Sequence, residues 1–91
     1  MSTTKRIEEL LKKDFKVYLL EVKDDSLNHV GHPEAKKSNG GHFDIVIVSP
    51  DFEGKTHLER HRMIYNVLNS EFKTGIHALR IRALSIQEYK P

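Results

Sequence analysis

Residues 43–49 constrain the fold more than any other part of the chain, because they are apolar at nearly every position and contain the longest apolar run, 45–48. A nearly continuous apolar segment indicates a strand in the middle of a sheet, covered on both faces. Pro50 ends this strand, since proline has no backbone N–H to donate. A run this short also falls far below the roughly 20 apolar residues of a membrane-spanning helix, so we expect no membrane association.

Two further segments have the alternating pattern of a strand with one solvated face. In residues 17–23, Leu20 and Val22 share one face, and Glu21 and Lys23 share the other. In residues 77–84 the apolar face holds Leu79, Ile81 and Ala83, and the polar face holds Arg80 and Arg82. We therefore expect three strands, with the charged residues of the outer two on a common open face.

Helical spacing predicts a first helix over Thr3–Asp14, with Thr3 or Thr4 as its N-cap. A second helix begins at Thr56, where Thr56 and Glu59 form the pattern of a capping box. We expect an apolar stripe on this second helix, and Gly75 as the glycine that ends it. The stripe comprises Leu58, Ile64, Tyr65, Val67, Leu68 and Phe72. Ser85 and Glu88 predict a last short helical turn.

The predicted order of elements is αββαβ(α), an α+β domain with a three-stranded mixed sheet and its helices on one face. The first two strands should pair antiparallel, and the second helix should cross between the second and third strands. A chain of 91 residues is long enough for one such domain, so we expect a single domain over 1–91. Residues 24–41 lack any periodicity, and a loop of this length in a small domain is usually functional or disordered.

The chain has six histidines and no cysteine, which excludes disulfides and thiolate metal sites supplied by this chain alone. His57 and His61 have the spacing of zinc ligands on a helix. However, Leu58 stands where a metalloprotease has its catalytic glutamate, so we favour a packed histidine. No phosphate-binding glycine-rich loop or Gly-x-Ser-x-Gly nucleophile elbow is present. The sequence therefore indicates a protein that is not an enzyme.

The remaining histidines are candidate metal ligands. His29, His32 and His42 lie in or beside the long loop, where solvated loop residues are the competing interpretation. His77 stands at the head of the third strand and has the same parity as Leu79. From spacing alone, His77 is either a ligand or a buried, hydrogen-bonded histidine.

Three segments together resemble the BolA family: Phe52-Glu53-Gly54-Lys55, then Arg60-His61-Arg62, then His77-Ala78-Leu79. The resemblance extends in the correct order from about residue 7 to residue 89, with Ser85-Ile86 and Tyr89 where the family often has Thr-Pro and Trp. It implies an αββαβ fold like that of the type II KH domain.

The resemblance also implies a function, which is binding to monothiol glutaredoxins and sharing a 2Fe-2S cluster in cluster trafficking and iron regulation. The family's histidine ligand matches His77. For the second ligand, which comes from the loop, we favour His32, then His29; His42, directly before the strand, is the third candidate and has a structural role as its competing interpretation. A partner cysteine and glutathione would then serve the other iron, and the isolated chain, having no thiolate, would hold no cluster.

Two surfaces follow from these expectations. Lys55, Arg60 and Arg62 are the predicted contacts with the glutaredoxin. The alternative function is nucleic-acid binding by a KH-like transcription regulator, through Lys55, Arg80 and Arg82, with DNA as partner. A net charge of +2 gives that alternative only modest support. We expect the isolated chain to be a monomer in the cytoplasm, with the nucleus as a second compartment.

Overall fold

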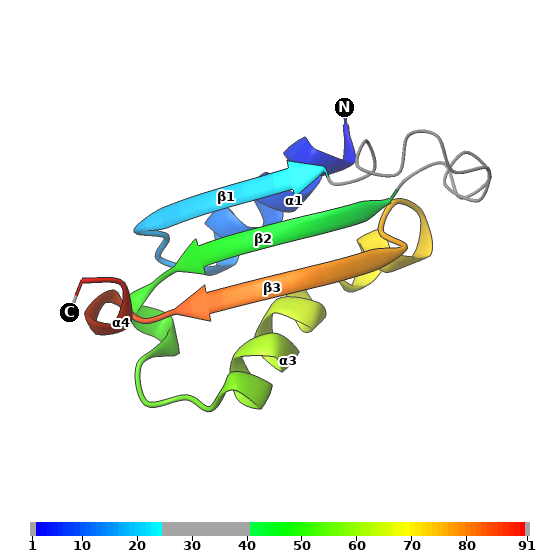
Figure 1. The fold of residues 1–91 in the computed structure, drawn as a ribbon. Helices are drawn as coiled ribbons and strands as arrows, with labels where there is room; N and C mark the ends of the chain where they lie inside the picture. Colours follow the sequence, from blue (N-terminus) through cyan, green and yellow to red (C-terminus); the bar gives the residue numbers. More distant parts are fainter. Residues whose placement is uncertain (1, 25–40, 91) are drawn as a thin grey trace.

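The structure, a computed structural model, describes residues 2–24 and 41–90. The sheet has three strands, and Figure 1 shows them side by side with helices packed against them. In chain order the elements are α1 (Thr3–Asp14), β1 (Leu19–Asp24), β2 (His42–Val48), η2 (Pro50–Phe52), α3 (His57–Val67), η3 (Asn69–Lys73), β3 (Ala78–Leu84) and α4 (Ile86–Tyr89). Within these residues no helix is both long enough and apolar enough to cross a membrane.

The sheet has the predicted topology, with the most apolar strand in the centre. The strand order is β1-β2-β3. β1 and β2 pair antiparallel, with Val22 opposite Ile45. β2 and β3 pair parallel, with Ile45 opposite Ile81. Because β2 and β3 are parallel, α3 lies in the connection between them, and both strands begin at the same end of the sheet (Figure 1).

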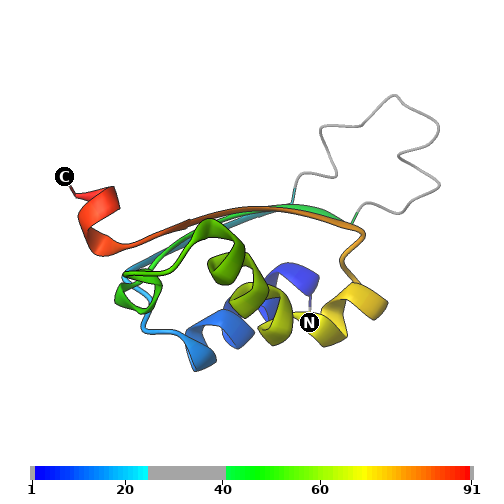
Figure 2. The same ribbon diagram turned by 90° about the horizontal axis from the view of Figure 1, so that it is seen from below.

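The helices cover one face of the sheet, except for α4. Figure 2 shows α1, α3 and η3 on one side of the sheet, whereas α4 turns toward the other side at the end of β3. The core between the layers contains Ile7 and Leu11 of α1, Ile45 and Ile47 of β2, and Ile64 of α3, all at most 1% exposed. Each such side chain stabilises the fold by about 1.5–3 kcal/mol.

α1 has the predicted bounds, but its N-cap is Ser2 rather than Thr3 or Thr4. The Ser2 side chain accepts a hydrogen bond from the backbone N–H of Lys5. Thr3 is already helical, and its hydroxyl oxygen accepts a bond from Arg6 Nη2 at 3.1 Å. The prediction was wrong by one residue because Thr3 contacts another side chain instead of capping the helix.

The capping box of α3 is confirmed, but the predicted apolar stripe is only partly buried. Thr56 and Glu59 exchange the two expected hydrogen bonds. Ile64 and Leu68 are fully buried, whereas Leu58 is 61% and Tyr65 41% exposed. Tyr65 packs on Phe72 instead, with ring centroids 5.0 Å apart. The helix also ends earlier than predicted, at Val67, with Leu68 as its C-cap.

Gly75 is therefore not the C-cap of α3, which is a second correction. It lies in the turn after η3 and does not have a positive φ. A Cβ on Gly75 would stand 2.6 Å from Oγ1 and 2.8 Å from Cγ2 of Thr3. Glycine fits this position because the side chain of Thr3 packs directly against the backbone of the turn.

The face of the sheet opposite α1 and α3 changes character along the strands. At one end, the register aligns Leu19, Val48 and Leu84, an apolar row. Val48 is fully buried although it lies outside the main core. α4 lies at this end (Figure 2), where Tyr18 and Tyr89 pack edge to face with centroids 6.0 Å apart. The next two rows carry the charged residues, so α4 leaves most of this face open.

Candidate functional site

His77 lies at the surface, immediately before β3 begins. Its side chain is exposed, so the interpretation of His77 as a buried, hydrogen-bonded histidine is wrong. The backbone of His77 is nevertheless held firmly, because its N–H donates to the carbonyl oxygen of Gly41 at 2.7 Å. An exposed imidazole on a fixed backbone is suited to binding a metal or a partner.

His42 is the first residue of β2, and its ring lies beside the ring of His77. The two ring centroids are 5.4 Å apart, with 48° between the ring planes. The parallel pairing of β2 and β3 brings them together, since it sets His42 opposite Ala78, the residue after His77. Two of the four predicted ligands are thus neighbours at one edge of the domain.

The spacing of this histidine pair fits a shared metal. Two imidazoles that bind one metal ion at a tetrahedral angle, with metal–nitrogen bonds of about 2.0–2.1 Å, have ring centroids roughly 5 Å apart. Over residues 2–24 and 41–90, no group of three or more His, Asp or Glu side chains could enclose a metal ion. The pair could therefore supply two ligands, and the others would have to come from elsewhere.

The other histidines do not complete this site in the described part of the chain. His29 and His32, the favoured second ligands, lie outside the described residues. His57 is exposed in the first turn of α3, and His61 is half-buried on the same helix. Neither forms a metal-binding group with other described residues.

Arg60, a predicted partner contact, is buried, and this prediction is corrected. Arg60 is 5% exposed. Its Nε donates to the carbonyl oxygen of Lys55 at 3.0 Å, and its Nη1 donates to the carbonyl oxygen of Ala83 at 2.9 Å. Nη1 also forms an ion pair with Glu88 at 2.6 Å. All of these contacts are inside the domain, so Arg60 joins α3 to the end of β3 and to α4.

Lys55 and Arg62 have exposed side chains on the helical side of the domain. Both remain available to a partner there. Lys55 precedes α3, on the side of the sheet opposite the strand arginines, and is not among the residues that line the open face. The structure therefore does not bring Lys55 together with Arg80 and Arg82 in one nucleic-acid surface.

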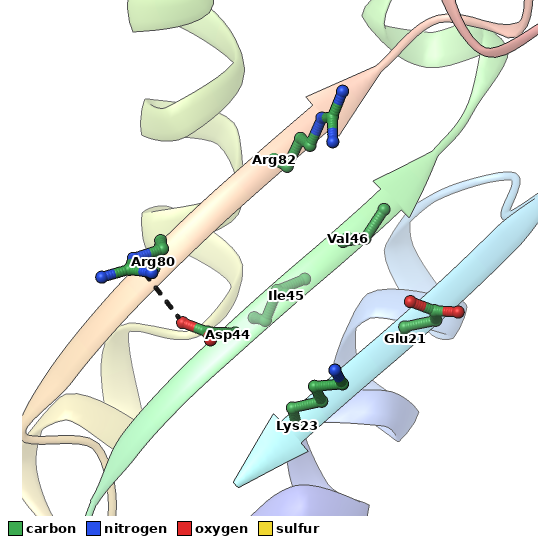
Figure 3. Close-up of a pocket in the computed structure, with 7 residues that line it drawn as sticks. All are labelled: Glu21, Lys23, Asp44, Ile45, Val46, Arg80 and Arg82. Carbon is green, nitrogen blue, oxygen red and sulfur yellow. Dashed lines mark ion pairs between the residues drawn. The ribbon is translucent and has the colours of Figure 1, made fainter. Parts of the chain in front are cut away.

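Arg80 and Arg82 lie on the open face, as the alternation of β3 predicts. They line a shallow hollow of about 220 Å³ together with Glu21, Lys23, Asp44, Ile45 and Val46. Figure 3 shows these seven residues on the three strands. Arg80 Nε lies 3.8 Å from Asp44 Oδ1. Arg82 has no ion pair or hydrogen bond with any described residue. The face is thus a mixture of charges with one unpaired arginine.

Two residues of importance to these sites were not found from the sequence. Asp44, on the central strand, neutralises part of the charge of Arg80. Gly41 accepts the N–H of both His77 and Ala78. The alternation of residues 43–49 contained the signal for Asp44, because it gives Asp44 the same parity as Val46 and so places both on the open face. Nothing local identifies Gly41, since its contacts come from the far end of the sequence.

Comparison with known proteins gives the same fold and a family. A family model described as BolA-like protein matches residues 11–88. SufE-like protein 1, chloroplastic/mitochondrial, from Arabidopsis thaliana is 45% identical over 82 residues, which are 86% of this chain but only 22% of that protein. The DNA-binding transcriptional regulator BolA from Escherichia coli (strain K12) is 41% identical over 90 residues, 99% of this chain and 82% of that protein.

A solved structure agrees with the observed architecture. The BolA domain of SufE1 from Arabidopsis thaliana superposes with a TM-score of 0.81 at 43% identity, covering 97% of this chain and 96% of that one. This likeness confirms the small α+β fold with a three-stranded mixed sheet. With the family model matching most of its length, the chain belongs to the BolA-like family.

Proposed function

We propose that this chain is a non-enzymatic partner of monothiol glutaredoxins, with which it shares a 2Fe-2S cluster in cluster trafficking and iron regulation. The observation that carries the proposal is the histidine pair, His42 and His77, with ring centroids 5.4 Å apart at the end of the sheet where β2 and β3 begin. The exposed imidazole of His77 and the half-buried imidazole of His42 would supply half of a coordination shell and leave the other half to a partner.

The set of donor atoms explains why a partner is needed. Clusters of this type are usually held by four thiolates, and this chain has no cysteine. Two histidines can replace two thiolates on one iron, as in Rieske centres, which raises the reduction potential. When bound, the cluster would supply a one-electron centre and a transferable unit of iron and sulfide. His77 would be one ligand, and His42, His32 or His29 the other.

The test is a reconstitution with the partner. A monothiol glutaredoxin is loaded with a cluster and glutathione, and this chain is added while visible absorption and circular dichroism are recorded. We expect a new spectrum that is lost in His77→Ala. The matched control is His57→Ala, which removes an exposed histidine from α3 and should leave the spectrum intact.

The second ligand is identified by the same assay. His42→Ala, His32→Ala and His29→Ala are compared one at a time, and the variant that alters the spectrum names the ligand. From the spacing of the pair we expect His42→Ala to do so. A spectrum that persists in His77→Ala, or the absence of any new spectrum with wild-type protein, would overturn the proposal.

The open face supports a second candidate, binding of nucleic acid. Arg82 is unpaired within the described residues, and Lys23 and Arg80 lie on the same face (Figure 3). The relative from Escherichia coli is described as DNA-binding. Glu21 and Asp44 oppose this function, because they reduce the positive charge of the face. Salt-dependent binding of duplex DNA by the isolated chain is the test.

A further inference from the structure

Gly41 holds the two strands together at the point where His77 leaves its turn. Its carbonyl oxygen accepts two backbone hydrogen bonds, from His77 N at 2.7 Å and from Ala78 N at 3.0 Å. Gly41 directly precedes His42 in the chain. The peptide group between Gly41 and His42 therefore links the backbone of His42 to the backbone of His77.

The absence of a side chain at Gly41 is what permits this approach. A Cβ there would stand 3.1 Å from each of three atoms, the Cβ and backbone N of His77 and the carbonyl oxygen of Gly75. Two of the three are backbone atoms, which cannot rotate away as the end of a long side chain can. A side chain at position 41 would therefore require His77 and the Gly75 carbonyl to shift by a few tenths of an ångström away from it.

Gly41 also has a φ of +81°, a left-handed conformation that favours glycine. Gly54 has nearly the same angle, φ +75°, but a Cβ at Gly54 would meet no atom within 4 Å. The two glycines share the backbone conformation and differ in their neighbours. Gly54 is thus a control for the effect of φ alone.

We propose that Gly41 is a positioning residue for the histidine pair, setting the separation of His42 and His77 through its carbonyl oxygen and its missing side chain. The metal-binding part of this statement rests on the proposed function. The positioning itself does not, because it concerns the distance between two rings in the isolated chain. A side chain at position 41 would separate the rings and leave the rest of the sheet paired.

The experiment compares four variants of the full chain: Gly41→Ala, Gly41→Asn, Gly54→Ala and Gly54→Asn. Asparagine tolerates positive φ better than alanine, so the asparagine variants keep the added Cβ with less backbone strain. This also provides a folded variant if Gly41→Ala does not fold. The readouts are nuclear Overhauser contacts between the rings of His42 and His77, amide hydrogen exchange at His77 and Ala78, and the spectrum of the shared cluster.

We expect both Gly41 variants to lose the ring-to-ring contacts. Exchange at the amides of His77 and Ala78 should rise at least about tenfold relative to amides in the middle of β2, since their common acceptor moves away. The intensity of the cluster spectrum per folded molecule should fall about tenfold in the same variants. Both Gly54 variants should keep the ring contacts and the spectrum.

The outcomes separate the two hypotheses. If no shared cluster forms with wild-type protein, but the ring contacts are lost only in the Gly41 variants, the proposed function fails and the positioning role holds. If Gly41→Asn keeps the ring contacts and wild-type exchange at His77 and Ala78, Gly41 is not a positioning residue. The same conclusion follows if the Gly54 variants disturb the pair equally.

Discussion

Arg60 Nη1 lies 2.6 Å from Oε1 of Glu88, so a buried guanidinium on α3 holds the carboxylate of α4. The same carboxylate oxygen accepts the backbone N–H of Ser85 at 2.8 Å and thereby completes a capping box. α4 has only four residues, too few to be stable as an isolated helix. Its position over the end of the open face therefore depends on Arg60 and on the cap.

Replacing Arg60 should destabilise the whole domain. Arg60→Met keeps an aliphatic side chain but removes the guanidinium donor from the carbonyl oxygens of Lys55 and Ala83 and leaves the carboxylate of Glu88 with only the backbone N–H of Ser85. We expect a loss of about 2 kcal/mol in the free energy of unfolding, measured in urea. Arg62→Met, two residues along on the exposed face, is the matched control and should change stability by less than about 0.5 kcal/mol. Equal losses in the two variants would contradict the structural role of Arg60.

The ion pair also predicts how stability depends on pH. The hydrogen bond from Arg60, followed by that from the backbone of Ser85, lowers the pKa of Glu88 from 4.5 to about 2. A pKa that is lower in the folded state gives stability that is present above about pH 4.5 and is lost as the pH falls toward 2. Glu88→Gln should therefore flatten the decline of stability over this range, measured by urea unfolding at several pH values.

The control for this measurement is Glu53→Gln. Glu53 is exposed and its side chain has no ion pair or hydrogen bond with any described residue. We expect the stability of the Glu53→Gln variant to decline with falling pH in the same way as that of the wild type. A Glu88→Gln variant with the wild-type slope would mean that Arg60 does not hold Glu88 in solution.

The contact between Gly75 and Thr3 predicts a mutation that can be rescued. Gly75→Ala places a methyl group against Oγ1 and Cγ2 of Thr3 and should cost about 1–2 kcal/mol. Thr3→Ala removes both of those atoms. The double variant should therefore be more stable than Gly75→Ala alone, and the coupling is measured by a double-mutant cycle in urea. Additive losses would exclude the proposed contact.

Binding of DNA, if present, should depend on the open face. Arg82→Gln should reduce the slope of log Kd against log salt concentration by about 1, the effect of losing one phosphate contact. Arg62→Gln removes an exposed arginine from the helical side and should leave the slope unchanged. A smaller slope in both variants would place the nucleic acid elsewhere, and no binding by wild-type protein would reject the second candidate function.

The sheet and the two capping boxes were predictable because their signals are local. Alternation of period two placed Arg80 and Arg82 on the face opposite Ile81, and one nearly continuous apolar segment identified the central strand. The capping boxes at Thr56 and Ser85 each need only residues three apart. These features do not depend on how distant segments meet.

The buried face of α3 was only partly predictable from its apolar residues. The buried row of α3 consists of Arg60, Ile64 and Leu68, which are four residues apart. Leu68 is also the C-cap of the helix. An arginine in that row cannot be recognised as buried from its polarity, because its acceptors come from Lys55, Ala83 and Glu88. Leu58 and Tyr65 belong to the predicted apolar stripe but lie outside this row, and both are exposed.

The candidate site was only partly predictable, because it depends on contacts between residues that are distant in the sequence. His42 and His77 could each be nominated from the sequence, but their proximity depends on the pairing of β2 with β3 across a long crossover. The exposure of His77 follows from the turn beside Gly41, which no periodicity describes. Sequence spacing gave the candidate residues, and the register of β2 with β3 brings two of them, His42 and His77, close together.

The direction of β2 and β3 has a practical consequence for labelling the protein. The histidine pair lies where these strands start, and α4 lies where β3 ends, seven residues further along. At about 3.3 Å per residue this separates the two ends by roughly 20 Å. Thr3, by contrast, packs on Gly75, two residues before His77. A dye or affinity tag attached at Lys90 would report on partner binding from a distance, whereas one placed ahead of Thr3 would crowd the histidines.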